Sequence, residues 1–195
     1  MRTSLVRRLL GGVLAVLLVS GVAGAQTPTP TEIAATRVQA NAGDADSQWL
    51  LGYYYSTGQG VPQDYAQAAS WYRQAADQGH VFAQFNLGVL SANGQGVPQD
   101  YAEAVTWYRL SAEQGYADAQ YNLGLMYGTG RGVPQDYVEA HKWRNLAASR
   151  ASAEDQTQYA ETRDAVATLM TPTQIEAAQN LAREWLAAFQ KCGGK

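Results

Sequence analysis

The residues of this chain best suited to acid–base, nucleophilic or metal chemistry are two histidines and one cysteine. They are His80, His141 and Cys192. Nucleophilic catalysis needs a Ser or Cys beside a base, and a structural zinc site needs four ligands, mostly Cys and His. Neither histidine has a suitable neighbour at motif spacing, and three residues are too few for zinc. The sequence therefore predicts no enzyme, no catalytic residue, no metal and no cofactor, and both histidines are interpreted as incidental.

Two further motifs do not fit ion or phosphate binding. Asp44-Ala45-Asp46 lacks the glycine and the distal glutamate of a calcium loop. Residues 128–132, Gly-Thr-Gly-Arg-Gly, lack the Gly-Lys-Ser/Thr ending and the preceding strand of a phosphate loop. They belong instead to a phrase that occurs three times in the chain.

This phrase, Gly-x-Gly-Val-Pro-Gln-Asp-Tyr, recurs at a period of 36 residues and begins at Gly58, Gly94 and Gly130. Such a period is typical of solenoids, in which each unit buries its apolar face only by stacking on its neighbours. We predict an all-α fold: a right-handed α/α superhelical solenoid of about three 36-residue helix-turn-helix repeats, with an N-terminal half-repeat and C-terminal capping helices. Function is then expected on a surface. The predicted repeats span 43–78, 79–114 and 115–150.

Each unit contains a helical pattern on either side of the phrase. The first pattern carries an internal glycine, which costs roughly 1 kcal/mol relative to alanine in a helix, so we expect another helix to approach closely there. These glycines are Gly52, Gly88 and Gly124. The second pattern begins at an aspartate that precedes Gln or Glu by three positions, which predicts a capping box. The pairs are Asp64 with Gln67, Asp100 with Glu103, and Asp136 with Glu139; the buried face is expected to hold Ala68, Trp71, Ala75 and their equivalents.

The two ends of the chain differ from the repeats. Residues 1–25 combine arginines, an apolar run and Ala-Gly-Ala, which predicts a cleaved signal peptide. Residues 26–31 are predicted to be a flexible linker, and 32–42 the half-repeat helix. A helix over 152–170 is expected before a second capping box, Thr171–Gln174 with proline at the first helical position, which begins a final helix. The solenoid domain is thus 32–190, with capping helices over 152–190 and a tail at 191–195.

Charge and composition restrict the partners and the location. The leader's apolar run is shorter than the about 20 residues of a membrane span, so we predict export, periplasmic more than extracellular, without stable membrane insertion after cleavage. The 14 basic and 17 acidic residues become 11 against 17 once the leader is removed, a charge of about −6. Dispersed, net negative charge argues against a nucleic-acid partner.

The chain resembles the Sel-one-like repeat (SLR) family, a bacterial exported type related to tetratricopeptide repeats. The resemblance covers 32–150 and is carried by Ala-Gln-Phe-Asn-Leu-Gly at 83–88, Ala-Gln-Tyr-Asn-Leu-Gly at 119–124 and the Gly-x-Gly-Val-Pro-Gln-Asp-Tyr phrase. It implies an adaptor or scaffold that mediates protein–protein interaction by binding a peptide or protein partner. Cysteine-rich relatives have been linked to β-lactam chemistry, but this chain lacks those cysteines.

The resemblance also implies that the first helix of each unit lines a concave, partner-binding face, and the helical periodicity agrees. Asp46 and Asp118 occupy further positions on it. The aromatic residues there could instead pack between repeats, and Asn86 and Asn122 could bind either a ligand or a neighbouring helix. The predicted binding residues are Trp49, Leu50, Tyr53, Phe82, Phe85, Asn86, Val89, Tyr121, Asn122 and Leu125.

Two alternative functions remain open from the sequence. One is a secreted hydrolase acting on β-lactam or peptidoglycan-related substrates, which rests only on the cysteine-rich relatives. The other is a self-associating scaffold that uses the convex face of the second helices. The residues expected on that convex face are Tyr72, Arg73, Tyr108 and Arg109.

Overall fold

The structure is a computed structural model that describes residues 27–193. Within this range the secondary structure consists of nine α-helices, without a strand. The predicted leader, 1–25, lies outside the described residues. The helices are α1 (Pro30–Asn41), α2 (Ala45–Thr57), α3 (Tyr65–Asp77), α4 (Val81–Asn93), α5 (Tyr101–Glu113), α6 (Ala117–Thr129), α7 (Tyr137–Arg150), α8 (Gln156–Ala167) and α9 (Pro172–Lys191).

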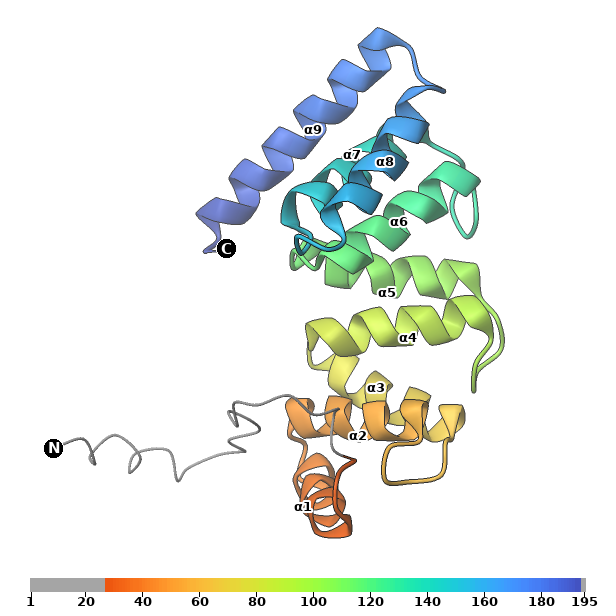
Figure 1. Ribbon diagram of the computed structural model, residues 1–195, viewed down its shortest axis with the longest axis vertical. Coiled ribbons are helices and arrows are strands. Elements are labelled where there is room, and N and C mark those ends of the chain that lie inside the picture. The colour runs from red at the N-terminus through yellow and green to blue at the C-terminus, as the bar shows by residue number, and fades with distance from the viewer. Residues whose placement is uncertain (1–26, 194–195) are drawn as a thin grey trace, which may run out of the picture.

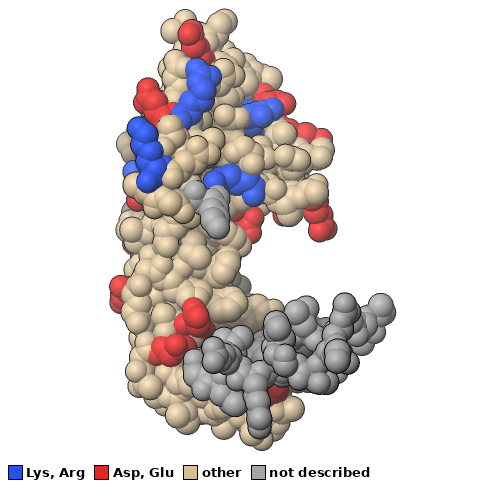
Figure 2. Space-filling model, turned by 90° about the vertical axis from the view of Figure 1, so that its left-hand side faces the viewer, with Lys and Arg blue, Asp and Glu red and all other residues tan. Residues whose placement is uncertain are grey.

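The helices form a curved stack. From α1 to α8 each helix packs on the next one in the chain, and α9 returns to pack on α7. Figure 1 shows the stack running from α1 at one end to α9 at the other, and Figure 2 shows that one side is hollowed. The predicted all-α solenoid is confirmed. The first helices of the three units are α2, α4 and α6, and the second helices are α3, α5 and α7.

The internal glycines lie at close contacts with the second helices, as expected, but the nearest atoms belong to side chains of those helices and not to their backbone. A Cβ atom built on Gly52 would lie 2.6 Å from Cδ1 of Tyr72, and one built on Gly88 would lie 2.8 Å from Cδ1 of Tyr108. The tyrosine rings of the second helices therefore lie directly on the glycine backbone. In the third unit the tyrosine is replaced by Arg144, whose Cγ lies 2.8 Å from the Cβ position of Gly124.

This packing corrects the predicted orientation of α3 and α5, whereas in α7 the equivalent tryptophan, Trp143, is 4% exposed, as predicted. Ala68 and Ala75 are fully buried, as expected, but the aromatic residue beside them is Tyr72, with 2% exposure, while Trp71 is only half-buried. Tyr108 is likewise 3% exposed. Tyr72 and Tyr108 therefore do not belong to the convex surface on which the sequence placed them.

The aspartate caps of the second helices are confirmed, but the reciprocal half of the capping box is wrong. Asp100 Oδ1 accepts hydrogen bonds from the backbone amides of Ala102 (2.8 Å) and Glu103 (3.0 Å). The backbone amide of Asp100 donates to the carbonyl of Ser91 on the preceding helix, at 2.9 Å. Because that amide is already bonded, the Glu103 carboxylate is free to bind Arg73. The same backbone contact joins Asp64 to Tyr55 and Asp136 to Tyr127.

The N-terminal linker is shorter than predicted, because α1 has a capping box of its own. The Thr29 side chain accepts from the amide of Glu32 at 3.2 Å, and the Glu32 carboxylate accepts from the amide of Thr29 at 2.7 Å. Pro30 then takes the first helical position, where its missing N–H costs nothing. Pro30 and Thr31, assigned to the linker over 26–31, are helical.

At the C-terminal end, the two capping helices differ in detail from the prediction. Ala151 is extended (φ −63°, ψ 156°) and ends α7, so α8 covers only the middle of the predicted 152–170. The predicted box at Thr171 is confirmed, with its amide donating to the Gln174 side chain at 2.9 Å. Helix α9 continues to Lys191, one residue into the predicted tail. Among residues 27–193, none of the helices is both long and apolar enough to cross a membrane.

Candidate functional site

The sequence-predicted binding residues lie on α2, α4 and α6, and all of them are partly exposed. Phe82 at the start of α4 is the most exposed large apolar side chain among them, with 42% of its surface open to solvent. The three helices place equivalent positions side by side because the repeat period is constant.

An aromatic cluster joins α2, α4 and the start of α6. It consists of Trp49, His80, Phe82, Phe85 and Tyr116. The Trp49 ring is stacked on the His80 ring at 5.4 Å and lies 5.7 Å from the Phe82 ring. Tyr116 meets Phe82 and Phe85 edge to face, at 5.2 Å and 5.1 Å. These distances are typical of favourable aromatic pairs, so the interpretation that Trp49 and Phe85 pack between repeats is confirmed.

Helix α8 covers part of the same face in the third unit. Its Tyr159 stacks on Tyr121 with ring centroids 4.4 Å apart. The hydroxyls of Tyr159 and Tyr116 both donate to the Asp118 carboxylate, each at 2.7 Å. Burial, followed by these bonds to a carboxylate, raises the pKa of both phenols. The predicted aromatic residues thus differ in their surroundings: Phe82 is exposed, Trp49 is half-buried against His80, and Tyr121 is covered by Tyr159.

The two asparagines of the predicted site lie against buried tyrosine hydroxyls. Burial raises the pKa of Tyr72 to about 12, an effect that the Ser56 and Asn86 side chains partly offset. Burial also raises the pKa of Tyr108 to about 12, again partly offset by an asparagine, Asn122. These contacts support the structural alternative for both amides, while contact with a partner stays a prediction.

His80 has a structural role that the sequence did not reveal. Its Nδ1 accepts from the backbone amide of Ala83 at 3.2 Å and so caps α4, at the position where Asp44 caps α2. Its Nε2 lies 3.2 Å from the Asp46 carboxylate. Burial lowers the pKa of His80, although Asp46 and Asp44 act in the opposite direction. Both ring nitrogens are therefore engaged, which leaves neither for a catalytic nucleophile.

This cap predicts a pH-dependent stability. Because the pKa of His80 is lowered on folding, the unfolded chain binds a proton first as the pH falls below the ordinary histidine value of about 6.5. Protonated Nδ1 cannot accept from Ala83, so we expect a loss on the order of 1 kcal/mol, typical of a lost N-cap. His80→Asn keeps a neutral acceptor and should flatten the melting temperature against pH between neutrality and mild acid.

A second histidine provides the control for this experiment. His141 is 3% exposed, its pKa is also lowered, first by burial and then by Arg163, and its Nδ1 has no hydrogen-bond partner. His141→Val, which copies the second unit's Val105, should remove the remaining dependence when combined with His80→Asn. Parallel pH profiles for the parent and His80→Asn would contradict the capping role.

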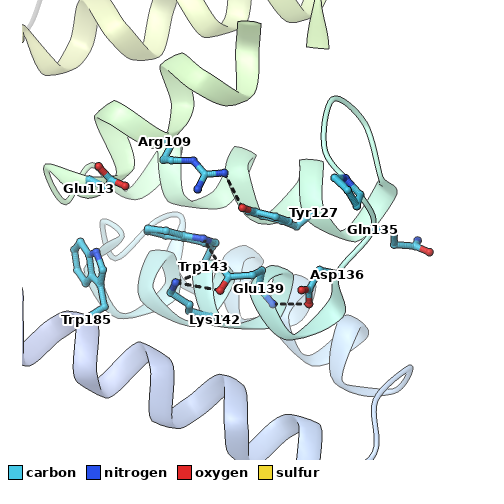
Figure 3. A pocket seen from close by; sticks show the side chains of 10 residues that line it. Arg109, Glu113, Tyr127, Gln135, Asp136, Glu139, Lys142, Trp143 and Trp185 are labelled. Atoms are coloured by element: carbon cyan, nitrogen blue, oxygen red, sulfur yellow. Dashed lines mark hydrogen bonds and ion pairs between the residues drawn. The ribbon is translucent and has the colours of Figure 1, made fainter. Parts of the chain in front are cut away.

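A polar cleft that the sequence did not predict lies between α5, α6, α7 and α9, with a volume of about 500 Å³. In Figure 3, Arg109 reaches the Tyr127 hydroxyl, and Glu139 binds both Lys142 and Trp143. The corresponding distances are 2.7 Å from Arg109 to Tyr127, 3.1 Å from Lys142 to Glu139 and 2.9 Å from Trp143 to Glu139. The lining is completed by Glu113, Pro134, Gln135, Asp136 and Trp185.

The arginine that lines this cleft has a different partner from its equivalent in the second unit. In the second unit, helix α4 has the small Ser91 where α6 has Tyr127, and Arg73 reaches across to Glu103 at 2.6 Å. One unit later, the equivalent arginine, Arg109, donates to the Tyr127 hydroxyl. The arginine–glutamate bridge between successive second helices is therefore not repeated there. The first unit resembles the third, because Tyr55 stands at the same position and accepts from Arg37 at 2.8 Å, so Ser91 of the second unit is the exception. Acidic and basic groups line the cleft together, so its charge does not select an ion of either sign.

Within the described residues, the chemistry-bearing side chains remain separate from one another. No three His, Cys, Asp or Glu side chains come together there as a group that could hold a metal ion. Cys192 is free and exposed at the end of α9. The stacked helical hairpins with their hollowed inner side define the class of this molecule, an α-solenoid repeat protein.

The chain belongs to the Sel1 repeat family. The family model described as Sel1 repeat matches residues 45–80, 81–116 and 117–152, the predicted period with each unit starting two residues later. The resemblance drawn from the sequence is confirmed, and proteins built from these repeats generally mediate protein–protein interaction and are typically not enzymes.

Two solved structures share this architecture. A Sel1 repeat protein from Oxalobacter formigenes is 37% identical with a TM-score of 0.56, and the match covers 60% of this chain and 45% of that one. The protein c5321, a protective antigen of uropathogenic Escherichia coli strains with an SLR fold, is 35% identical with a TM-score of 0.60, covering 73% of this chain and 34% of that one. The chain therefore spans less than half the length of either. No curated protein matches it.

Proposed function

We propose that this protein is a non-enzymatic adaptor, exported to the periplasm, that binds a peptide or protein partner on the inner face of α2 and α4. The observation that carries this proposal is the exposure of Phe82, which keeps 42% of its surface open although Trp49 and Tyr116 hold it on either side. Export rests on the leader pattern of residues 1–25.

An exposed aromatic ring between two other rings is well suited to binding. Its neighbours already restrict its rotamers, so a partner that covers it gains apolar burial at a small cost in side-chain entropy. Aromatic side chains near the centre of an interface carry much of the binding energy. Because α8 covers Tyr121, the proposed site is narrower than the sequence suggested: Trp49, Leu50, Tyr53 and Phe82 are favoured over Tyr121, Asn122 and Leu125.

The experiment is affinity capture from a cell-envelope extract, with the protein produced from its full sequence and processed by the host. A captured protein is then purified, and its affinity is measured for the parent, for Phe82→Ala and for Leu110→Ala. Leu110 is the matched control, since it is 39% exposed but lies on α5. We expect Phe82→Ala to weaken binding at least about tenfold, or 1.4 kcal/mol, and Leu110→Ala to leave it unchanged. Equal affinities for all three would place the binding surface elsewhere.

Neither alternative is proposed. Hydrolysis rested only on the cysteine-rich relatives, whose cysteines this chain lacks. Self-association was expected to use four residues of the convex face. Two of them, Tyr72 and Tyr108, are buried. The other two form intramolecular bonds, Arg109 with Tyr127 and Arg73 with Glu103.

A further inference from the structure

The charged residues on the helices assigned to the inner face, α2, α4 and α6, are all acidic. The helices that line it, α2, α4 and α6, contain no lysine or arginine, whereas α2 and α6 each carry an aspartate in the first turn. In the view of Figure 2, few charged side chains lie over the middle of the stack. The Lys and Arg side chains visible there lie in the upper part of the molecule. A partner held there through a carboxylate would find no cation on these three helices.

The two aspartates of this face lack a permanent positive partner in the described structure. The Asp46 side chain is 81% exposed, and its ion-pair partner is His80, whose lowered pKa keeps the imidazole neutral at pH 7. Asp118 accepts from two tyrosine hydroxyls, which are neutral donors. An added cation would therefore gain attraction without displacing an existing lysine or arginine.

The exposed Phe82 ring and the half-buried Trp49 ring lie near the Asp46 carboxylate. Phe82 and His80 are 5.9 Å apart, Trp49 is stacked on His80, and Asp46 bonds to the same imidazole. One small region thus presents two aromatic rings and a carboxylate on adjacent helices. A lysine or arginine side chain is the group that fits both, because its cation is attracted by a ring face and by a carboxylate while its aliphatic stem covers apolar surface.

We infer that the inner face of α2 and α4 is selective for a basic segment of a protein partner, with a lysine or arginine side chain lying over Trp49 and Phe82 and its charge beside Asp46. This inference rests on the proposed function and names the chemistry of the partner. Attraction between the acidic face and a basic segment also speeds association, and added salt weakens it.

The test uses an array of short random-sequence peptides with equal numbers of basic, neutral and acidic members, probed with the full-length protein after host processing. Asp46→Asn and Phe82→Ala are compared with the matched controls Asp77→Asn and Leu110→Ala, which change an exposed aspartate and an exposed apolar residue on α3 and α5. We expect basic peptides to be enriched and to lose at least about tenfold in affinity with either inner-face variant, but with neither control. The loss should shrink for Asp46→Asn as salt is added.

Each other result decides against the inference in a different way. Enrichment of neutral or acidic peptides that depends on Phe82 would overturn the basic selectivity while leaving the proposed function in place. Basic peptides retained equally by all four variants would reflect general attraction to a negatively charged protein and would overturn the site. Absence of binding by any peptide would overturn the inference, while the proposed function would still be decided by the capture experiment with Phe82→Ala.

Discussion

Gly96→Ala is expected to lower the free energy of unfolding by about 2–5 kcal/mol. Gly96 has φ +71°, a left-handed conformation that costs an alanine roughly 1–2 kcal/mol. The new Cβ would also lie 2.2 Å from the carbonyl carbon of Tyr65 and 2.5 Å from the amide nitrogen of Ala66. Backbone atoms cannot move aside as a flexible side chain can, so overpacking adds about 1–3 kcal/mol.

The first glycine of the same phrase is the matched control. Gly94 has nearly the same conformation, with φ +68°, but the nearest atom to its Cβ position is the Cβ of Gln99 at 3.1 Å. Gly94→Ala should therefore cost mainly the conformational part, about 1–2 kcal/mol. Urea unfolding of both variants gives the difference as a change of midpoint at constant slope. Equal losses would mean that the loop does not press on the preceding unit.

The same contact recurs in the next unit and explains the spacing of the two glycines. The Cβ position of Gly132 lies 2.2 Å from the carbonyl oxygen of Tyr101, which begins α5 as Tyr65 begins α3. The first glycine of each phrase ends a helix. In the second and third phrases, the second glycine lets the loop reach the first residue of the previous unit's second helix, whereas Gly60 of the first phrase lies against Ile33 and Pro28. A solenoid is stabilised by such contacts between neighbours, so a defect here weakens more than its own unit.

Much of this fold could be predicted from the sequence because its determinants are local and repeated. Turn glycines, the Val-Pro pair and the capping aspartates act within a few residues, so a constant period gives the units and their helices. The start of α1, which was not predicted, could also have been found from local residues, since Thr29–Glu32 repeats the capping box that was predicted correctly at Thr171–Gln174. That error came from assigning the segment to a linker on composition.

Other errors could not be avoided, because they depend on contacts between helices. Trp71 and Tyr72 are adjacent aromatic residues, and the contact of the Tyr72 ring with Gly52 decides which one is buried. Similarly, Glu103 leaves the capping box because the amide of Asp100 finds the carbonyl of Ser91 on the preceding helix. No periodicity within one helix carries this information.

The candidate site shows the same division. The constant period predicted which positions of α2, α4 and α6 are equivalent and partly exposed, and the structure leaves all of them partly exposed. It could not predict that α8 would return over α6 and stack Tyr159 on Tyr121, nor that α9 would bring Trp185 to the cleft beside Arg109. Both events depend on the path of the capping helices, which have no repeat to serve as a guide.

Gly88→Leu should destabilise the middle unit by about 1–3 kcal/mol or more, even though it removes a glycine from a helix. The Cβ atom alone would lie 2.8 Å from Cδ1 and Cε1 of Tyr108 and 3.3 Å from the carbonyl oxygen of Ala104. Tyr108 is 3% exposed, so its ring has no free volume to enter, and the larger leucine must separate α4 from α5. The gain of roughly 1 kcal/mol in helix propensity offsets only part of this cost.

Gly128→Ala is the control that separates propensity from packing. Gly128 also lies in a helix, α6, but the atom nearest to its Cβ position is the Cβ of Ala140, at 3.6 Å. This distance is an ordinary van der Waals contact. This substitution should raise stability by up to about 1 kcal/mol, while Gly88→Leu lowers it. Thermal and urea unfolding of the two variants with the parent would show the opposite signs. Because each unit is stabilised through its neighbours, a stable Gly88→Leu protein would mean that α4 and α5 can separate without weakening the stack, contrary to the contact seen at Tyr108.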